Sequence, residues 1–228
     1  MTRLLPLMLL LLASSAQAAL DAEQLREQGR TALDALVERS SQLPARDQAI
    51  LAVVQAPNEG LAESTLESLA AWREQHPDDL PAKLYEGYGW LFMAGEYVKQ
   101  QNYFRAAELA KRGFFLMDEA VDQNPEDWRL RLLRARMDCY VPAEFGRHVV
   151  ALKDLRYLQE NPEQVPAELR PLMDFLQARA QRAAGDEAAA KALANQAPWR
   201  ELLQAEGRLP ITQAEVERVL APIVEAAP

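Results

Sequence analysis

The chain has 228 residues, with 25 Lys or Arg against 34 Asp or Glu and a net charge of −9. Such an acidic chain is repelled by phosphates, which excludes nucleic acid and anionic membrane surfaces as bulk partners. A single cysteine, Cys139, excludes an internal disulfide, so packing must hold the core. Only three isoleucines occur, while Ala, Leu, Glu, Arg and Gln are abundant, and these residues favour helices. We therefore predict an all-α fold.

Residues 1–18 have the features of an export signal. Arg3 supplies a positive charge, Leu4 to Leu12 form an apolar core, and Ala16-Gln17-Ala18 is a small-residue cleavage motif. The apolar run is shorter than the ~20 residues of a membrane-spanning helix, which disfavours the alternative of an uncleaved anchor. We expect cleavage between Ala18 and Ala19.

The mature chain would keep 24 basic residues against 34 acidic ones, a net charge of −10. No cysteine follows the cleavage motif directly, so lipid attachment at a new N-terminus is excluded. We expect an exported protein without stable membrane insertion after signal cleavage. It would be periplasmic if the source is a Gram-negative bacterium and secreted otherwise.

Proline, glycine and capping signals divide the rest of the chain into helices. Pro77-Asp78-Asp79 and Pro125-Glu126-Asp127 are typical helix starts, and Thr212 with Glu215 predicts a capping box. Pro57-Asn58-Glu59-Gly60 predicts a turn. The expected helices are 21–39, 45–55, 61–75, 81–98, 105–122, 128–140, 147–160, 166–184, 187–196, 199–205 and 212–225. Two points stay open: residues 100–104 form a loop or continue a helix, and Pro171 kinks a helix or marks its true start.

The stretch 76–142 contains the two most informative helices. The first, 81–98, is apolar almost all round, and its three glycines suggest close helix approach or a bend; we interpret it as a buried core helix rather than a cofactor site. The second, 128–140, has apolar stripes on two nearly opposite sides, which indicates a helix packed between two neighbours. The glycines are Gly87, Gly89 and Gly95.

Weak internal similarity recurs along these helix pairs. Pair boundaries carry Pro-acidic or Asn-Pro signals at 76–79, 124–127 and 161–163. Small residues at the pair contact, followed by a closing proline, occur at Gly113, Ala120 and Pro125, and again at Gly185, Ala190 and Pro198. In this the chain resembles the tetratricopeptide-repeat (TPR) family, whose unit is a helix pair of about 34 residues. The resemblance implies a right-handed solenoid of antiparallel helix pairs with atypical terminal repeats.

A narrower resemblance covers residues 84–158. It is carried by Gly113, 116–121, 124–127, 131–135, Pro142, 145–147 and 154–155. This stretch is similar to an uncharacterised group of bacterial exported TPR proteins, which implies a scaffold and no particular activity. The resulting division of the chain is a signal peptide at 1–18, N-terminal helices or a cap at 19–75, TPR-like repeats at 76–198 and C-terminal capping helices at 199–228.

The sequence contains no motif typical of catalysis. A phosphate-binding glycine loop, a zinc-protease helix motif and a serine nucleophile elbow are all absent. Cys139 and His148 could in principle share a metal, but two ligands from different elements are weak support for a site, and we interpret them as a buried thiol and a surface histidine. We expect no catalytic residue, no cofactor and no metal, and hence no enzyme.

Arginines of the helix 128–140 are the candidate partner-binding residues. Arg129 and Arg136 lie seven residues apart on one side of the helix, flanked by Trp128 and Tyr140, and guanidinium groups suit the carboxylates and amides of a peptide. Arg131 and Arg134 lie on the opposite side. In TPR arrays the first helix of each pair lines the concave face, so one of these sides should face a groove. The alternative is a set of solvated arginines that balance nearby acids.

These observations favour a protein- or peptide-binding scaffold of the bacterial cell envelope, with the partner held in the concave groove of a TPR-like array. A structural subunit that forms a homodimer through the aromatic-rich helix 81–98, or joins a larger envelope complex, is the alternative. An enzyme with an unrecognised site ranks last.

Overall fold

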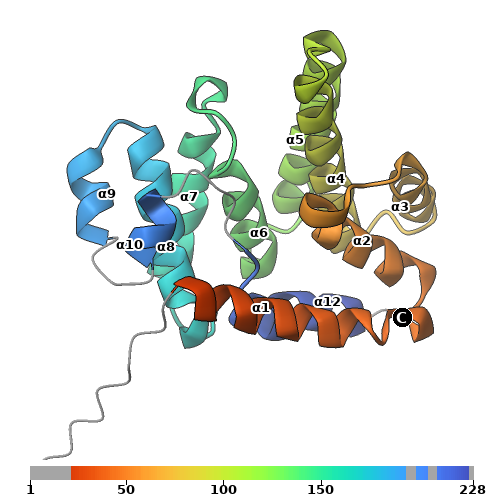
Figure 1. The fold of residues 1–228 in the computed structure, drawn as a ribbon, viewed down its shortest axis with the longest axis horizontal. Helices are drawn as coiled ribbons and strands as arrows, with labels where there is room; N and C mark the ends of the chain where they lie inside the picture. Colours follow the sequence, from red (N-terminus) through yellow and green to blue (C-terminus); the bar gives the residue numbers. More distant parts are fainter. Residues whose placement is uncertain (1–21, 194–198, 205–209, 226–228) are drawn as a thin grey trace, which may run out of the picture.

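A computed structural model describes residues 22–193, 199–204 and 210–225 (Figure 1). The predicted signal peptide and its cleavage position lie outside these residues. Throughout the described part of the chain the regular elements are helices, which confirms the all-α prediction. They are α1 (Ala22–Val37), α2 (Ala45–Glu59), α3 (Glu63–Gln75), α4 (Leu80–Lys99), α5 (Tyr103–Gln123), α6 (Trp128–Asp138), α7 (Arg147–Glu160), α8 (Arg170–Ala183), α9 (Glu187–Leu193), α10 (Trp199–Gln204), α11 (Gln213–Glu215), the π-helical turn η4 (Val216–Leu220) and α12 (Ala221–Glu225), with short 3-10 turns η1 (Ser40–Gln42), η2 (Ala143–Phe145) and η3 (Ala167–Leu169).

The predicted helix starts have the expected caps. The carboxylate of Asp79 accepts from the backbone N of Ala82 at 3.0 Å, which caps α4. Asp127 caps α6 in the same way, and Thr212 with Glu215 forms the predicted capping box. Pro171 lies in the first turn of α8, so it marks the start of that helix rather than a kink.

The predicted end of the second helix is wrong. The sequence predicts a helix end at residue 55 and a turn at Pro57, whereas α2 continues through Pro57 to Glu59. The proline loses a single backbone donor in the last turn, and Gly60 then ends the helix with a positive φ of 81° and a hydrogen bond from its N to the carbonyl of Ala56.

Successive helices pack on one another, and the longest contact joins α4 to α5 as an antiparallel hairpin (Figure 1). Glycines allow this close approach: a Cβ at Gly87 would lie 2.8 Å from the carbonyl oxygen of Gly113, and one at Gly113 would lie 2.7 Å from that of Gly87. Ala120 on the same helix is fully buried. The prediction that Gly113 faces the partner helix is confirmed. Asn102 caps α5, so residues 100–102 are a turn and not a helix continuation.

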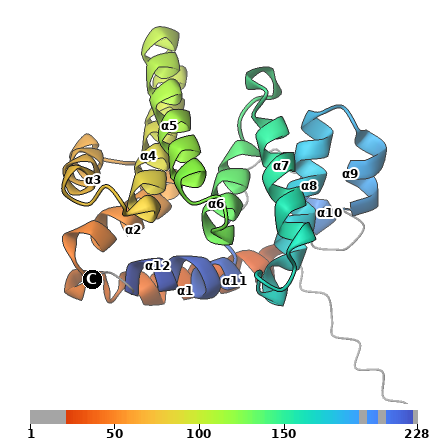
Figure 2. The ribbon, with the colours of Figure 1, turned by 180° about the vertical axis from the view of Figure 1, so that it is seen from behind.

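The two ends of the described chain meet. Helix α1 runs alongside α11, η4 and α12, and this layer crosses the foot of the other helices (Figures 1 and 2). Helix α1 and the segment before α11 approach each other closely, because a Cβ at Gly29 would lie 1.8 Å from the carbonyl oxygen of Ile211. Arg46 of α2 binds the same layer by donating a hydrogen bond to the carbonyl of Ile223 at 2.7 Å. Its guanidinium also donates to both carboxylate oxygens of Asp79, which caps α4. The helices expected to cap the array thus pack against each other.

The core is continuous from α2 to α8 and includes the fully buried side chains of Ile50, Leu66, Met117, Leu155 and Phe175. Helix α6 lies inside it, in contact with α4, α5, α7 and α8, as its two apolar stripes predict. None of the helices in the described ranges is long and apolar enough to cross a membrane.

Candidate functional site

A groove of about 830 Å³ lies between the α4–α5 hairpin, α6 and the layer of chain ends. One wall is the hairpin face, and the other is the end of α6 with the segment that follows it. Helix α1 and the C-terminal segment form the floor, and the end of α2 closes one side. The volume falls in the range of ligand- and peptide-binding cavities in proteins.

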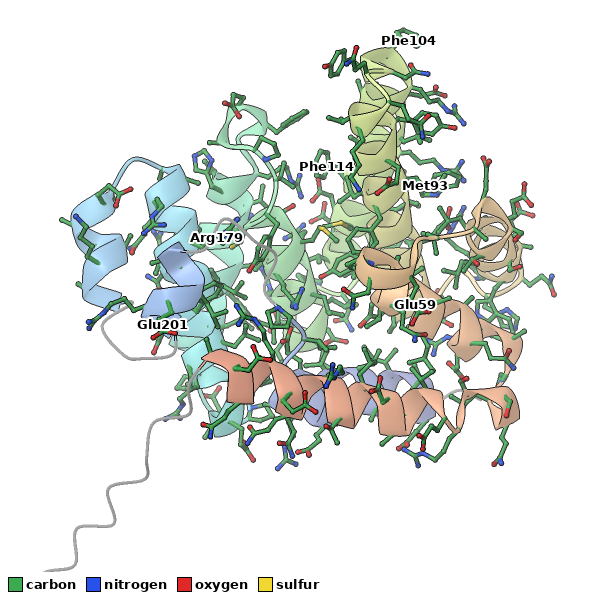
Figure 3. The ribbon with its side chains drawn as sticks, in the orientation of Figure 1. Glu59, Met93, Phe104, Phe114, Arg179 and Glu201 are labelled. Atoms are coloured by element: carbon green, nitrogen blue, oxygen red, sulfur yellow. The ribbon has the colours of Figure 1, made fainter. Side chains whose placement is uncertain are left out.

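The groove surface is largely apolar. Seven aromatic residues among the described ones line it: Tyr85, Tyr88, Phe92, Tyr103, Phe114, Tyr140 and Phe145. The rings of Phe114 from α5 and Phe145 from η2 lie 6.3 Å apart and bring the two walls together, and Phe114 is labelled in Figure 3. Small residues of α5, such as Ala107 and Ala110, leave space along the hairpin wall.

Charges in the groove are balanced. Six charged residues line it within the described ranges, three basic and three acidic: Arg26, Arg30, Arg136, Asp34, Glu59 and Glu215. Arg136 and Glu215 are hydrogen-bonded to each other at the floor, and both side chains are mostly buried. The other Glu215 oxygen accepts from the backbone N of Thr212 at 2.8 Å, so this one carboxylate anchors both α6 and the C-terminal cap.

Two tyrosines beside the ion pair are neutral hydrogen-bonding groups. Burial raises the pKa of Tyr85 and of Tyr88 well above the ordinary value for tyrosine. The Tyr88 hydroxyl donates to the carbonyl of Leu133, which fixes α4 against α6. Burial alone would lower the pKa of Arg136, but Glu215 together with Tyr88 and Tyr140 more than offsets it, so the pKa is raised and the guanidinium stays charged. An occupant would therefore meet apolar rings above a charge pair that is already neutralised.

The four predicted partner-binding residues divide into two groups. Arg136 and Tyr140 line the groove. Trp128 and Arg129 do not: Trp128 is buried, and the Arg129 guanidinium stacks over its ring at 4.7 Å from the centroid. Arg129 and Arg136 share a helical side by spacing, but they are two turns apart along α6, and only the later one reaches the groove.

Arg131 and Arg134, on the opposite side of α6, neither line the groove nor are the solvated arginines of the alternative interpretation. Both are buried, and both bind the fully buried carboxylate of Asp154 on α7, Arg131 through one bond of 2.8 Å and Arg134 through two of 2.8 and 2.9 Å. Arg147 adds paired bonds to Asp118 and Asp138. Three arginines and three aspartates thus form one ion-pair cluster that joins α5, α6 and α7. The spacing of arginines along a helix is the same in a solvated surface patch and in a packed ion-pair cluster, so the spacing alone does not predict which of the two forms.

Cys139 is buried, with its thiol in contact with the carbonyl oxygen of Leu176 at 3.3 Å, and burial raises its pKa. The described ranges hold no group of three or more His, Cys, Asp or Glu side chains that could bind a metal.

Sequence reasoning missed most of the groove. Part of its floor comes from residues 210–220, over seventy positions from α6, and one wall comes from the face of the α4–α5 hairpin. The available signal was an aromatic pair at a helix start beside a polar turn: Tyr103, which lines the groove, and Phe104, which follows it in the chain. Both are exposed in the structure, as are Val98 and Phe145.

Comparisons with known protein families, with characterised proteins and with solved structures found no match.

Proposed function

We propose that this chain is a non-enzymatic binding protein that holds an apolar segment of a protein partner in the groove between α4, α5, α6 and the chain ends. The observation that carries the proposal is the groove itself, which is about 830 Å³ in volume and lined by seven aromatic side chains among the described residues. Apolar surface of this extent is costly to leave in water and marks interaction sites. The proposed setting is the bacterial cell envelope, because residues 1–18 resemble an export signal.

The chemistry of the groove supports a neutral, apolar contact face on the partner. Arg136 is already paired with Glu215, so a further charge buried beside this pair would have to compete for one of its members and would be expensive to desolvate. Aromatic rings with a few polar tips suit the side chains of an amphipathic helix, which docks its apolar face into a groove. The TPR resemblance, with its concave binding face, supports the same function.

Ala107 is the sharpest position for a test. It is exposed, lies on α5 and lines the groove, so a large side chain there enters the groove without disturbing the core. A photo-crosslinking amino acid at position 107 in the exporting cell should yield a protein adduct. We expect the linked peptide of the partner to be apolar and uncharged at the point of attachment.

Ala71 is the matched control, since it is also an exposed helical alanine and lies outside the groove. The purified partner should bind Ala107→Arg at least tenfold more weakly than the parent, and Ala71→Arg as well as the parent. Identical adducts from positions 71 and 107, together with unchanged affinity of Ala107→Arg, would refute the groove as the binding site.

A further inference from the structure

The turn end of the α4–α5 hairpin projects beyond the neighbouring helices (Figures 1 and 3). Its turn is held by backbone bonds of 2.9 Å from Gln101 N to the Val98 carbonyl and from Asn102 N to the Tyr97 carbonyl. The Asn102 side chain accepts from Arg105 N at 3.2 Å, and Gln101 takes a positive φ of 60°. The tip therefore presents its side chains from a defined backbone.

The tip is apolar and charge-balanced. Phe104 is 87% exposed, Tyr103 66% and Val98 49%, three large apolar residues within seven positions. Single exposed apolar side chains are ordinary, but a cluster on a projection indicates a contact. The neighbouring charges are internally paired, Lys99 with Glu96 at 2.6 Å and Arg105 with Glu108 at 2.8 Å.

The same tip borders the groove, because Val98 and Tyr103 also line it. One continuous surface thus includes both the projecting tip and the groove. A two-fold symmetric contact uses the same patch on both copies, so that patch must be complementary to itself, and a projection beside a groove can be. Charge favours contact between copies at this place. The chain carries −9 overall, so two copies repel over most of their surfaces, whereas the tip and the groove are each balanced.

The area is sufficient for a specific dimer. The two aromatic tip side chains, Phe104 and Tyr103, expose roughly 300 Å² together, taking about 200 Å² for an aromatic side chain. Two such tips and equal areas of the two groove surfaces that would receive them then bury roughly 1,200 Å², the lower end of the range for specific interfaces.

We infer that two copies of this chain associate as a symmetric dimer in which the hairpin tip of each, led by Phe104, docks at the groove mouth of the other. The inference uses the groove of the proposed function and names a second copy as an occupant of its outer part. A partner segment would then bind deeper in the groove or displace the tip.

Light scattering of the purified mature chain over a wide concentration range tests the dimer. The double variant Val98→Ser, Phe104→Ser should raise the dimer dissociation constant at least about 30-fold, the loss typical of one buried aromatic anchor. Phe115→Ser, Val149→Ser is the control, because these side chains are also largely exposed, 64% and 63%, and lie outside the groove. Circular dichroism should show the same helical content for all three proteins.

A photo-crosslinking amino acid at Phe104 tests the arrangement. In the purified protein it should link to groove residues of a second copy, on α5 or between Met137 and Phe145. A parent chain that stays monomeric, a control that dissociates as readily as the tip variant, or adducts confined to other surfaces would each overturn the dimer. The crosslink to a protein partner at position 107 is a separate measurement. If the chain is monomeric and still forms that crosslink, the dimer is refuted and the proposed function is not.

Discussion

Helix α6 carries arginines on two faces, and the two faces differ in what surrounds them. On the side toward α7, Arg131 and Arg134 bind Asp154 within the ion-pair cluster, and Tyr157 covers the Arg131 guanidinium at 4.0 Å from the ring centroid. On the other side, Arg136 meets Glu215 beneath the groove. The first face joins helices, and the second forms the floor of an open cavity.

The comparison teaches that pairing alone does not distinguish a structural charge from one at a binding site. Arg131 and Arg134 on the first face and Arg136 on the second are all paired with buried carboxylates. The two faces differ in access to solvent. The Asp154 side chain is fully buried, while the Arg136 side chain keeps 19% of its surface exposed beside the groove. Removing one partner of a sealed pair leaves a charge that water cannot reach, whereas water can enter the groove and solvate the remaining group.

Arg134→Ala should have the largest effect. It removes two bonds to Asp154 and one to Asp118, and leaves part of the carboxylate charge of Asp154 uncompensated in the core. We expect a loss of about 3–5 kcal/mol in the free energy of unfolding, as for other broken buried pairs. Denaturant unfolding followed by circular dichroism measures it. Arg156→Ala, an exposed arginine on α7, is the control and should change stability by less than ~0.5 kcal/mol. Equal losses in the two variants would contradict a stabilising cluster.

Arg136→Ala should have an intermediate effect. Glu215 keeps its bond to the Thr212 backbone and gains water from the groove, so we expect a loss of about 1–3 kcal/mol. The double variant Arg136→Ala, Glu215→Gln should recover part of that loss, because the neutral amide no longer needs a cation. A double-mutant cycle by thermal unfolding gives the coupling, for which about 0.5–3 kcal/mol is expected. A coupling of zero would mean that the pair does not anchor the C-terminal segment.

Arg129→Ala should have the smallest effect. Its guanidinium stacks on Trp128, an interaction of about 0.5–1 kcal/mol at an accessible site, and its buried Nε has no hydrogen-bond acceptor among the described residues. Because Arg129 does not line the groove, partner capture through position 107 should be unchanged. A binding loss as large as that of Ala107→Arg would move the partner contact from the groove to the start of α6.

Local signals in the chain account for the helices. Proline and acidic residues predict where α4 and α6 begin, and the capping box predicts the last helical segment, because each depends on groups only a few residues apart. Gly113 predicts a tight helix contact, since a missing side chain is visible in the sequence whatever lies opposite. The prediction of a turn at Pro57 is wrong because a proline near a helix end costs only one hydrogen bond, and the cap at Gly60 decides where the helix ends.

The candidate site depended on long-range packing, and the sequence identified only two of its residues. Helical spacing placed Arg129 beside Arg136 and Arg131 beside Arg134, but it could not say which neighbours α6 would meet or how far along it a groove would extend. Arg131 and Arg134 are buried because Asp154, twenty or more positions later, is brought against them by α7. Arg136 faces a groove because Glu215 returns to it across 79 positions, with the C-terminal segment seated on α1 where Gly29 leaves room for Ile211. Caps and turns act through adjacent residues and can be inferred from sequence, whereas burial and cavities arise only when distant segments pack.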